Sequence, residues 1–210
     1  MSRTMIALPC MDTMPIDFVK SLLYLQKGEG TDVCFNDSSL IYDSRNMLSL
    51  TAIDNKYDYV LWLDSDMVFK PDTLDVLRHD LDTHTDIGMV TGVYMKRRKP
   101  IVPVMYSRLE PPAKGEDGRM HKQIDDYVEY PRKQLFPIAG CGFGCVLTRV
   151  LLLKEVWDAF GVAFNPLPWA GEDISFCHRV NQLAKHQIWC DSNVQCGHVG
   201  KQIFFDERGE

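Results

Sequence analysis

The sequence lacks any hydrophobic run long enough for a membrane-spanning helix, and its N-terminus has no signal-peptide pattern. It also lacks a Cys-x-x-Cys pair, and its seven cysteines are scattered and odd in number. Free thiols in a reducing compartment explain this cysteine usage better than a disulfide framework or a structural zinc site. These absences predict a chain with no transmembrane segment and no dependence on disulfides.

An excess of basic residues is missing as well. The chain holds 23 Lys and Arg against 29 Asp and Glu, a net charge of −6, which argues against nucleic-acid binding over a large surface. The remaining composition, 45% hydrophobic and 25% charged, is ordinary for a globular protein. A length of 210 residues suffices for one large α/β domain or two small ones.

The stretch from 58 to 70 is the one around which the chain is organised. Tyr59–Leu63 is continuously apolar, as expected of a strand buried on both faces, and it leads into Asp64-Ser65-Asp66. Two carboxylates this close repel each other unless a positive charge lies between them. Mg²⁺ or Mn²⁺ would supply that charge and commonly also binds substrate phosphates. The alternative is a pair of solvated loop carboxylates that cap the next helix.

Strands and helices alternate through the first half of the sequence. The pattern predicts strands at 4–9, 32–35, 59–63 and 87–94, and helices at 16–26, 44–53 and from 71 onward. Ser44 is expected to cap its helix. Its inward residues are predicted to be Met47, Leu48 and Ala52. Such alternation indicates a mostly parallel sheet, in which ligands bind at the carboxyl ends of the strands, where the two aspartates would lie.

The second half has a less regular pattern. The basic cluster at 96–99 is interpreted as a solvated loop, and 107–123, rich in Pro, Gly and charge, as a mobile loop or lid. The further predictions are an edge strand at 126–130, a strand at 145–147, helices at 148–160 and from 171, and short strands at 187–190 and 193–196. Three glycines within 140–144, directly before an apolar strand, suggest close approach of the backbone to a ligand.

Two further polar groups are candidates for a functional site. Glu172 and Asp173 begin a predicted helix, where the helix dipole favours acidic side chains, so capping is their simplest role. His198 lies between Gly197 and Gly200, and a single histidine in such a place is more often structural than a metal ligand.

Several of these stretches fall in a known order. They are Ser44-Arg45-Asn46, Leu63-Asp64-Ser65-Asp66, Thr91-Gly92-Val93-Tyr94, Gly140-Cys141-Gly142-Phe143-Gly144, Gly171-Glu172-Asp173-Ile174-Ser175-Phe176-Cys177 and Gly197-His198-Val199-Gly200. In order and spacing the sequence resembles the GT-A nucleotide-sugar glycosyltransferases, in particular the family-2-like branch of bacteria and their phages. The resemblance implies a single GT-A, Rossmann-like α/β domain over 1–210, with a mixed, mostly parallel sheet flanked by helices. Within this domain, 1–95 would be the nucleotide-binding half and 96–210 the acceptor and catalytic half. The protein would act in the cytoplasm of a bacterial or phage-infected cell.

The resemblance also implies a cofactor, Mn²⁺ or Mg²⁺, and catalytic residues. Asp66 and His198 would bind the metal, with Asp64 beside them. Asp173 would be the general base and Glu172 would bind the acceptor. A metal stabilises the negative charge that builds on a departing nucleoside diphosphate, and a carboxylate activates the acceptor hydroxyl.

The donor implied by the resemblance is a nucleotide diphosphate-sugar. Arg45 would contact its nucleotide or diphosphate, and Asp64 its sugar or ribose. The other expected donor-site residues are Ser65 and, around the nucleobase, Pro9, Met11, Asp12 and Asp37. Asp37 is the nearest candidate for the acidic uracil-contacting residue that is usual on the second strand, where this sequence has no clean equivalent.

The predicted function is therefore transfer of a hexose or N-acetylhexosamine, from UDP more than from GDP, to an acceptor hydroxyl with inversion. Glycan, lipid, protein and modified nucleic acid all remain open as acceptors. One alternative is a non-catalytic sugar-nucleotide or glycan-binding module of the same fold. A second is a haloacid-dehalogenase-like phosphatase, but its Asp-x-Asp strand normally lies near the N-terminus, whereas here two predicted strands precede it.

Overall fold

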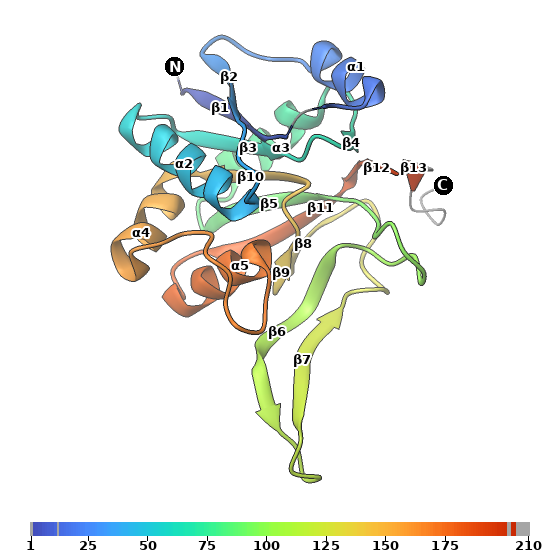
Figure 1. Cartoon of the computed structure of the whole chain (residues 1–210). Helices are drawn as coiled ribbons and strands as arrows, with labels where there is room; N and C mark the ends of the chain where they lie inside the picture. The colour runs from blue at the N-terminus through green and yellow to red at the C-terminus, as the bar shows by residue number, and fades with distance from the viewer. Residues whose placement is uncertain (1, 12, 201–202, 205–210) are drawn as a thin grey trace.

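The structure is a computed structural model that describes residues 2–11, 13–200 and 203–204 (Figure 1). The helices are α1 (Ile16–Tyr24), α2 (Ile41–Asp54), α3 (Thr73–Thr83), α4 (Val150–Phe160) and α5 (Glu172–Leu183). The strands of the largest sheet are β1 (Thr4–Pro9), β2 (Thr31–Asn36), β3 (Tyr59–Leu63), β5 (Ile87–Val93), β8 (Leu135–Ile138), β10 (Cys145–Arg149) and β11 (Gln187–Gln195). The shorter sheets contain β4 (Met67–Val68), β12 (Gly197–Val199) and β13 (Ile203–Phe204), and β6 (Met105–Lys114), β7 (Met120–Asp126) and β9 (Gly140–Cys141).

The largest sheet has the strand order β2-β1-β3-β10-β5-β11-β8. β1, β2, β3, β5 and β11 run in one direction, while β10 and β8 run against their neighbours. The prediction of a mixed, mostly parallel sheet is confirmed. Because β1, β3 and β5 share one direction, their carboxyl ends open at the same edge, which is where α/β sheets bind ligands.

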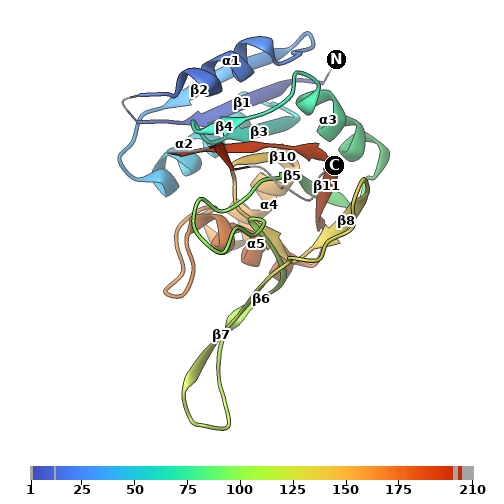
Figure 2. The same cartoon turned by 90° about the vertical axis from the view of Figure 1, so that its right-hand side faces the viewer.

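Helices cover both faces of this sheet. The residues of β1 and β3 alternate between the two faces, so Met5 and Trp62 belong to one apolar core and Ile6 and Leu61 to the other. α2, α4 and α5 contribute to the first core, and α1 and α3 to the second. Figure 2 shows α1 and α3 above the sheet and α4 and α5 below it. This burial explains why the central strands are continuous apolar runs in the sequence.

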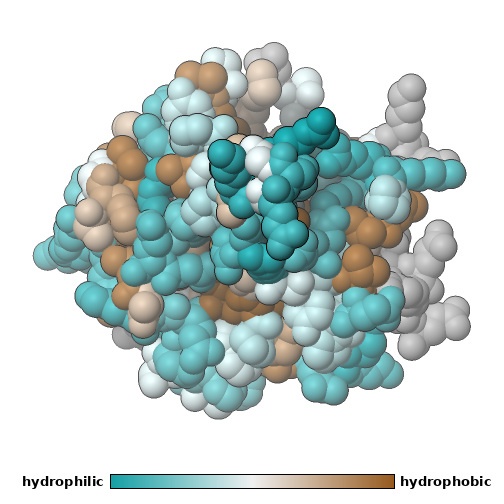
Figure 3. Space-filling model, turned by 90° about the horizontal axis from the view of Figure 1, so that it is seen from below, coloured by the Kyte–Doolittle hydropathy of each residue, from teal (hydrophilic) through white to brown (hydrophobic). Residues whose placement is uncertain are grey.

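The segment after β5 differs from the prediction. β6 and β7 pair as an antiparallel hairpin that projects from the body, so most of 107–123 lies in strands and not in the predicted loop (Figure 2). The predicted edge strand at 126–130 is also wrong, because β7 ends at Asp126. The register shifts and the exposure of most side chains, apart from the buried Met105 and Leu109, explain why the hairpin was missed, since neither strand has the regular apolar alternation of a half-buried strand. From below, hydrophilic side chains dominate the projecting part (Figure 3).

Smaller corrections concern helix ends and registers. α2 begins at Ile41, so Ser44 lies inside the helix and is not its N-cap. Leu48 and Ala52 are buried as predicted, but Met47 is 49% exposed. The two short strands predicted near 187–196 are one strand, β11, with an irregular register beyond Asp191.

All seven cysteines are free, as predicted, and five of them are buried. Across the described part of the chain, no helix combines the length and the apolar character that crossing a membrane requires.

Candidate active site

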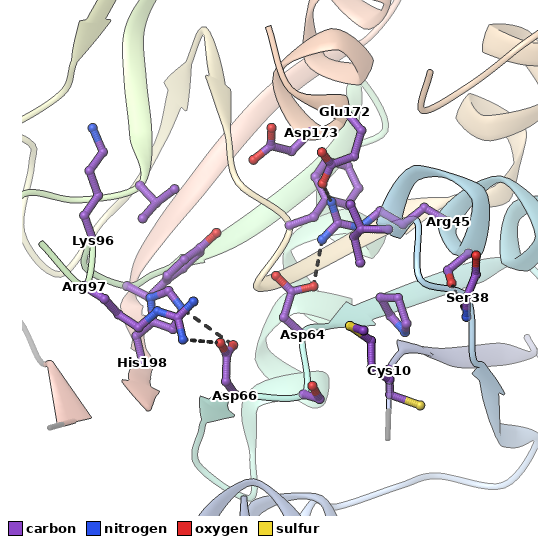
Figure 4. A pocket seen from close by; sticks show the side chains of 18 of the residues that line it. Cys10, Ser38, Arg45, Asp64, Asp66, Lys96, Arg97, Glu172, Asp173 and His198 are labelled. Carbon is purple, nitrogen blue, oxygen red and sulfur yellow. Dashed lines mark hydrogen bonds and ion pairs between the residues drawn. The ribbon is translucent and has the colours of Figure 1, made fainter. Parts of the chain in front are cut away.

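A pocket of about 910 Å³ opens at the carboxyl ends of β1, β3 and β5 (Figure 4). The turn after β3 supplies Asp64–Asp66, and the segment after β5 supplies Tyr94 and 96–98. The N-terminal part of α2 supplies Ile41, Ser44 and Arg45; the start of α5 supplies Glu172 and Asp173; and β12 supplies His198. The topology thus collects residues from nearly the whole chain at one edge of the sheet.

Arg45 is the most deeply placed charge in this pocket. Its Nη2 lies 2.7 Å from Asp64 Oδ1 and its Nη1 lies 2.5 Å from Glu172 Oε1. The guanidinium also lies over the Phe143 ring, 5.3 Å from the centroid. Burial raises the pKa of the Asp64 carboxyl, and the charge of Arg45 opposes that shift. Arg45 therefore ties the turn after β3 to the start of α5.

Asp66 is arranged differently, although it lies only two residues further on. Its Oδ2 is 2.7 Å from Arg97 Nη1, and its Oδ1 is 3.5 Å from His198 Nε2. Burial would raise the pKa of Asp66, but the neighbouring His198 ring and the charge of Arg97 hold it below its ordinary value. Backbone pairing of β12 with β4 fixes His198 opposite Met67 and so beside Asp66.

The ring of His198 is oriented by its other nitrogen. Nδ1 lies 2.9 Å from the carbonyl oxygen of Met95, which assigns the proton of a neutral ring to Nδ1. The lone pair of Nε2 then faces Asp66 Oδ1, an atom that is buried and has no hydrogen-bond partner among the described residues. Two lone-pair atoms cannot face each other stably, so a second ring proton or a metal ion must lie between them.

This arrangement fits a divalent cation that shares its shell with a ligand. Asp66 and His198 supply one oxygen and one nitrogen, and a histidine whose other nitrogen donates to a carbonyl is typical of metal ligands. Within the described ranges, no cluster of three His, Cys, Asp or Glu side chains could hold a metal alone. Mn²⁺ or Mg²⁺ would therefore need phosphate oxygens and waters to complete its coordination, as Mg²⁺ commonly does.

Asp173 is the free carboxylate of the pocket. Its neighbour Glu172 is bound to Arg45, whereas Asp173 Oδ1 accepts the backbone N–H of Ile174, at 2.7 Å, and no other hydrogen bond from the described part of the chain. Burial, followed by the charge of Glu172, raises the pKa of Asp173 to about 6. In Figure 4 the two side chains point apart. The structure thus gives the adjacent carboxylates separate positions.

The glycine-rich segment is explained by a side chain of the protein. A Cβ on Gly142 would lie 2.2 Å from Tyr94 Oη, and one on Gly144 would lie 2.8 Å from Tyr94 Cζ. Gly144 also donates its N–H to Tyr94 Oη, at 3.1 Å. These glycines therefore make room for a tyrosine that lines the pocket.

The structure brings only some of the other expected donor-site residues, including those around the nucleobase, into the pocket. Pro9, Met11 and Ser65 line the pocket, Asp37 does not, and Asp12 lies outside the described residues. Sequence reasoning missed Cys10, Thr13, Ser38 and Ser39 at this end, and Tyr94, Val104, Tyr106 and Phe143 elsewhere in the lining. The segment 96–99 is a largely exposed loop, as interpreted, but sequence reasoning missed that Lys96, Arg97 and Arg98 line the pocket; their position after a strand carboxyl end was the available signal.

No family model matches the chain, and no curated protein matches it by sequence. Solved structures do match it. A197 from STIV matches with a TM-score of 0.69 at 14% identity, covering 98% of this chain and 94% of A197. GalNAc-T7 with UDP, GalNAc and Mn²⁺ has a TM-score of 0.62 at 10% identity, and TarS 1–349 of S. aureus has 0.53 at 14%. The matches cover 95% and 91% of this chain but only 44% of GalNAc-T7 and 60% of TarS. These likenesses show a GT-A-like fold.

Proposed function

We propose that this chain is a metal-dependent glycosyltransferase that uses a nucleotide diphosphate-sugar. The observation that carries the proposal is that one pocket contains the Asp66–His198 pair and a separate carboxylate, Asp173. A GT-A-like neighbour crystallised with UDP, GalNAc and Mn²⁺ supports the donor class and the metal. In this proposal the donor is a UDP-sugar in preference to a GDP-sugar, and the sugar is a hexose or N-acetylhexosamine. Residues 1–95 form the nucleotide-binding half of the domain and 96–210 the acceptor and catalytic half.

In this mechanism the residues of the chain position charge and protons. Asp66 and His198 would hold Mn²⁺ or Mg²⁺, which stabilises negative charge on a leaving diphosphate when bound. Pro9, Met11 and the serines at 38–39 would hold the nucleoside at the opposite end of the pocket. Arg45 keeps Asp64 in place under the sugar, because its guanidinium binds Asp64 and Glu172 together.

Asp173 would accept the proton of the acceptor hydroxyl. A pKa of about 6 leaves its carboxylate mostly ionised at pH 7 and makes it a stronger base than an ordinary aspartate. Glu172 and Asp64, the neighbouring carboxylates within the described residues, are both bound to Arg45, so neither is free to act as a nucleophile. Direct attack by the acceptor, with inversion at the anomeric carbon, follows from this arrangement.

The test is thermal unfolding of the unaltered protein and of Asp66→Ala with UDP and Mn²⁺. A ligand at 100 times its Kd adds about 2.7 kcal/mol to the free energy of unfolding. We expect Asp66→Ala to lose that increment, and His198→Ala to need a higher Mn²⁺ concentration to reach it. Asp117→Ala, which removes an exposed carboxylate on the hairpin, is the control and should behave like the parent.

Two outcomes would contradict the proposal in different ways. Stabilisation of Asp66→Ala equal to that of the parent would place the metal–nucleotide site elsewhere. UDP binding without release of sugar from any UDP-hexose or UDP-N-acetylhexosamine, with or without Mn²⁺, would favour the non-catalytic binding module.

A further inference from the structure

The pocket has a cationic end formed by Lys96, Arg97 and Arg98. These residues lie in a short loop between β5 and β6. Its ends are fixed by backbone hydrogen bonds from Lys96 N to Val102 O and from Val104 N to Tyr94 O, each 2.9 Å. These hydrogen bonds hold the loop in place beside the pocket. The pocket therefore has a positively charged end, although the chain as a whole carries a net charge of −6.

These cations differ in how far they are neutralised. Lys96 Nζ lies 2.5 Å from Asp126 Oδ1, and Arg97 is bound to Asp66. Arg98 and the exposed Lys99 that follows it have no hydrogen bond or ion pair within the described part of the chain. Positive charge at this end therefore exceeds what the protein itself compensates.

The cationic end lies between two parts of the site and away from the nucleoside end: Arg97 binds Asp66 of the proposed metal site, and Lys96 lies toward the proposed base. Tyr106 links the two, because Lys96 Nζ lies 5.5 Å from its ring centroid and Asp173, after burial, contributes to raising its pKa. Figure 4 shows Lys96 and Arg97 on one side of Asp66, and Cys10 and Ser38 on the other. A group bound by Arg98 and Lys96 would thus belong to the molecule whose hydroxyl approaches Asp173.

We propose that the acceptor carries a phosphate group, which Arg98 and Lys96 bind while its hydroxyl faces Asp173. This inference rests on the proposed function. Guanidinium groups bind phosphate through paired hydrogen bonds, and an ammonium adds a point charge. In the transfer, the acceptor oxygen bonds to the anomeric carbon and the bond from that carbon to the nucleoside diphosphate breaks. The diphosphate leaves with the electron pair, and the hydroxyl proton passes to Asp173.

The surroundings favour a small phosphorylated acceptor over a long polyanion. The hairpin that extends from this end carries four basic and five acidic side chains. The basic ones are Arg108, Lys114, Arg119 and Lys122, and the acidic ones are Glu110, Glu116, Asp117, Asp125 and Asp126. A nucleic acid would need a continuous basic track, which this hairpin does not offer. The chemical class indicated is a polyol or sugar phosphate with a free hydroxyl.

The experiment compares glycerol 3-phosphate with glycerol by calorimetric titration of the full chain, with and without UDP and Mn²⁺. We expect glycerol 3-phosphate to bind at least about tenfold more tightly than glycerol, a difference of about 1.4 kcal/mol. Arg98→Ala should weaken the phosphate ester about tenfold and leave glycerol unchanged. Arg119→Ala, which removes an exposed arginine at the far end of the hairpin, is the matched control and should bind the ester like the parent.

Three results would overturn the inference. Equal affinity for glycerol and its phosphate would remove the phosphate site. Displacement of the ester by UDP, with Arg98→Ala weakening UDP as much as the ester, would assign the cations to the donor diphosphate. Binding of a single-stranded oligonucleotide far more tightly than the ester would indicate a polyanionic ligand instead. Failure of UDP to bind with Mn²⁺ would contradict the proposed function, while the titrations without nucleotide would still decide the phosphate site.

Discussion

The two sides of the Asp64-Ser65-Asp66 turn form the same kind of ion pair in different surroundings. Arg45 and Arg97 each place a nitrogen 2.7 Å from one of the aspartates. The Arg45 side chain is 3% exposed and is shared with Glu172, whereas the Arg97 side chain is 48% exposed. The two ion pairs therefore differ in strength although their distances are equal, because solvent reaches the guanidinium of Arg97 and not that of Arg45.

The difference indicates separate roles for the two aspartates, Asp64 in holding the structure together and Asp66 in binding a ligand. Arg45 holds two elements together by binding both Asp64 and Glu172, which suits a scaffold under the proposed donor site. The Arg97 side is open, with an unpartnered Asp66 oxygen facing His198, which suits exchange of ligands. Each prediction below tests whether the two sides can be altered independently.

The largest expected effect concerns the neighbouring carboxylates of α5. Asp173→Asn should lower turnover roughly 10²–10⁴-fold, as expected for loss of a general base, while UDP affinity stays near that of the parent. In the parent, turnover should rise as pH increases through about 6, because Asp173 must lose its proton to act. Steady-state kinetics across pH would check both. Retained configuration in the first-formed product, seen by NMR, would exclude Asp173 as the base of an inverting attack.

The next effect is on stability and contrasts the two arginines directly. Arg45→Ala leaves Asp64 and Glu172 facing each other without a cation, so the free energy of unfolding should fall by about 3–5 kcal/mol. Arg97→Ala removes a half-exposed pair and should cost ~1 kcal/mol or less. Urea unfolding of both variants measures the difference. Equal losses would mean that burial does not distinguish the two sides.

The sequence predicted the parts of this contrast that depend on local pattern. β3 is recognisable because both of its faces are buried, and the turn after it follows directly. The alternation of elements placed Asp66 at a strand carboxyl end, and the GT-A resemblance added Asp173 and His198. Local pattern also placed the helices to within a few residues, apart from the beginning of α2.

Other features depended on contacts between distant segments. Nothing near Arg45 in the sequence indicates that Glu172 neutralises it, since the two are 127 residues apart. The hairpin was missed because exposed, irregular strands carry no alternation. The cations at 96–98 look like an ordinary charge run until β5 places them at the pocket. Contacts between distant segments, and not local propensity, determine these three features.

The smallest predicted effect concerns the pKa values of Asp64 and Asp66, which should shift in opposite directions. In the chain without metal, NMR titration should find Asp66 protonating below the ordinary value of 3.8 and Asp64 above it. The contribution of Asp66 to stability is then lost as pH falls through its folded pKa, whereas that of Asp64 is lost as pH rises through its own. Arg97→Ala should raise the pKa of Asp66, because it removes one of the charges that lower it, and should leave the pKa of Asp64 unchanged. A matching shift at Asp64 would show that the two sides are coupled, and the separation of scaffold from metal site would then fail.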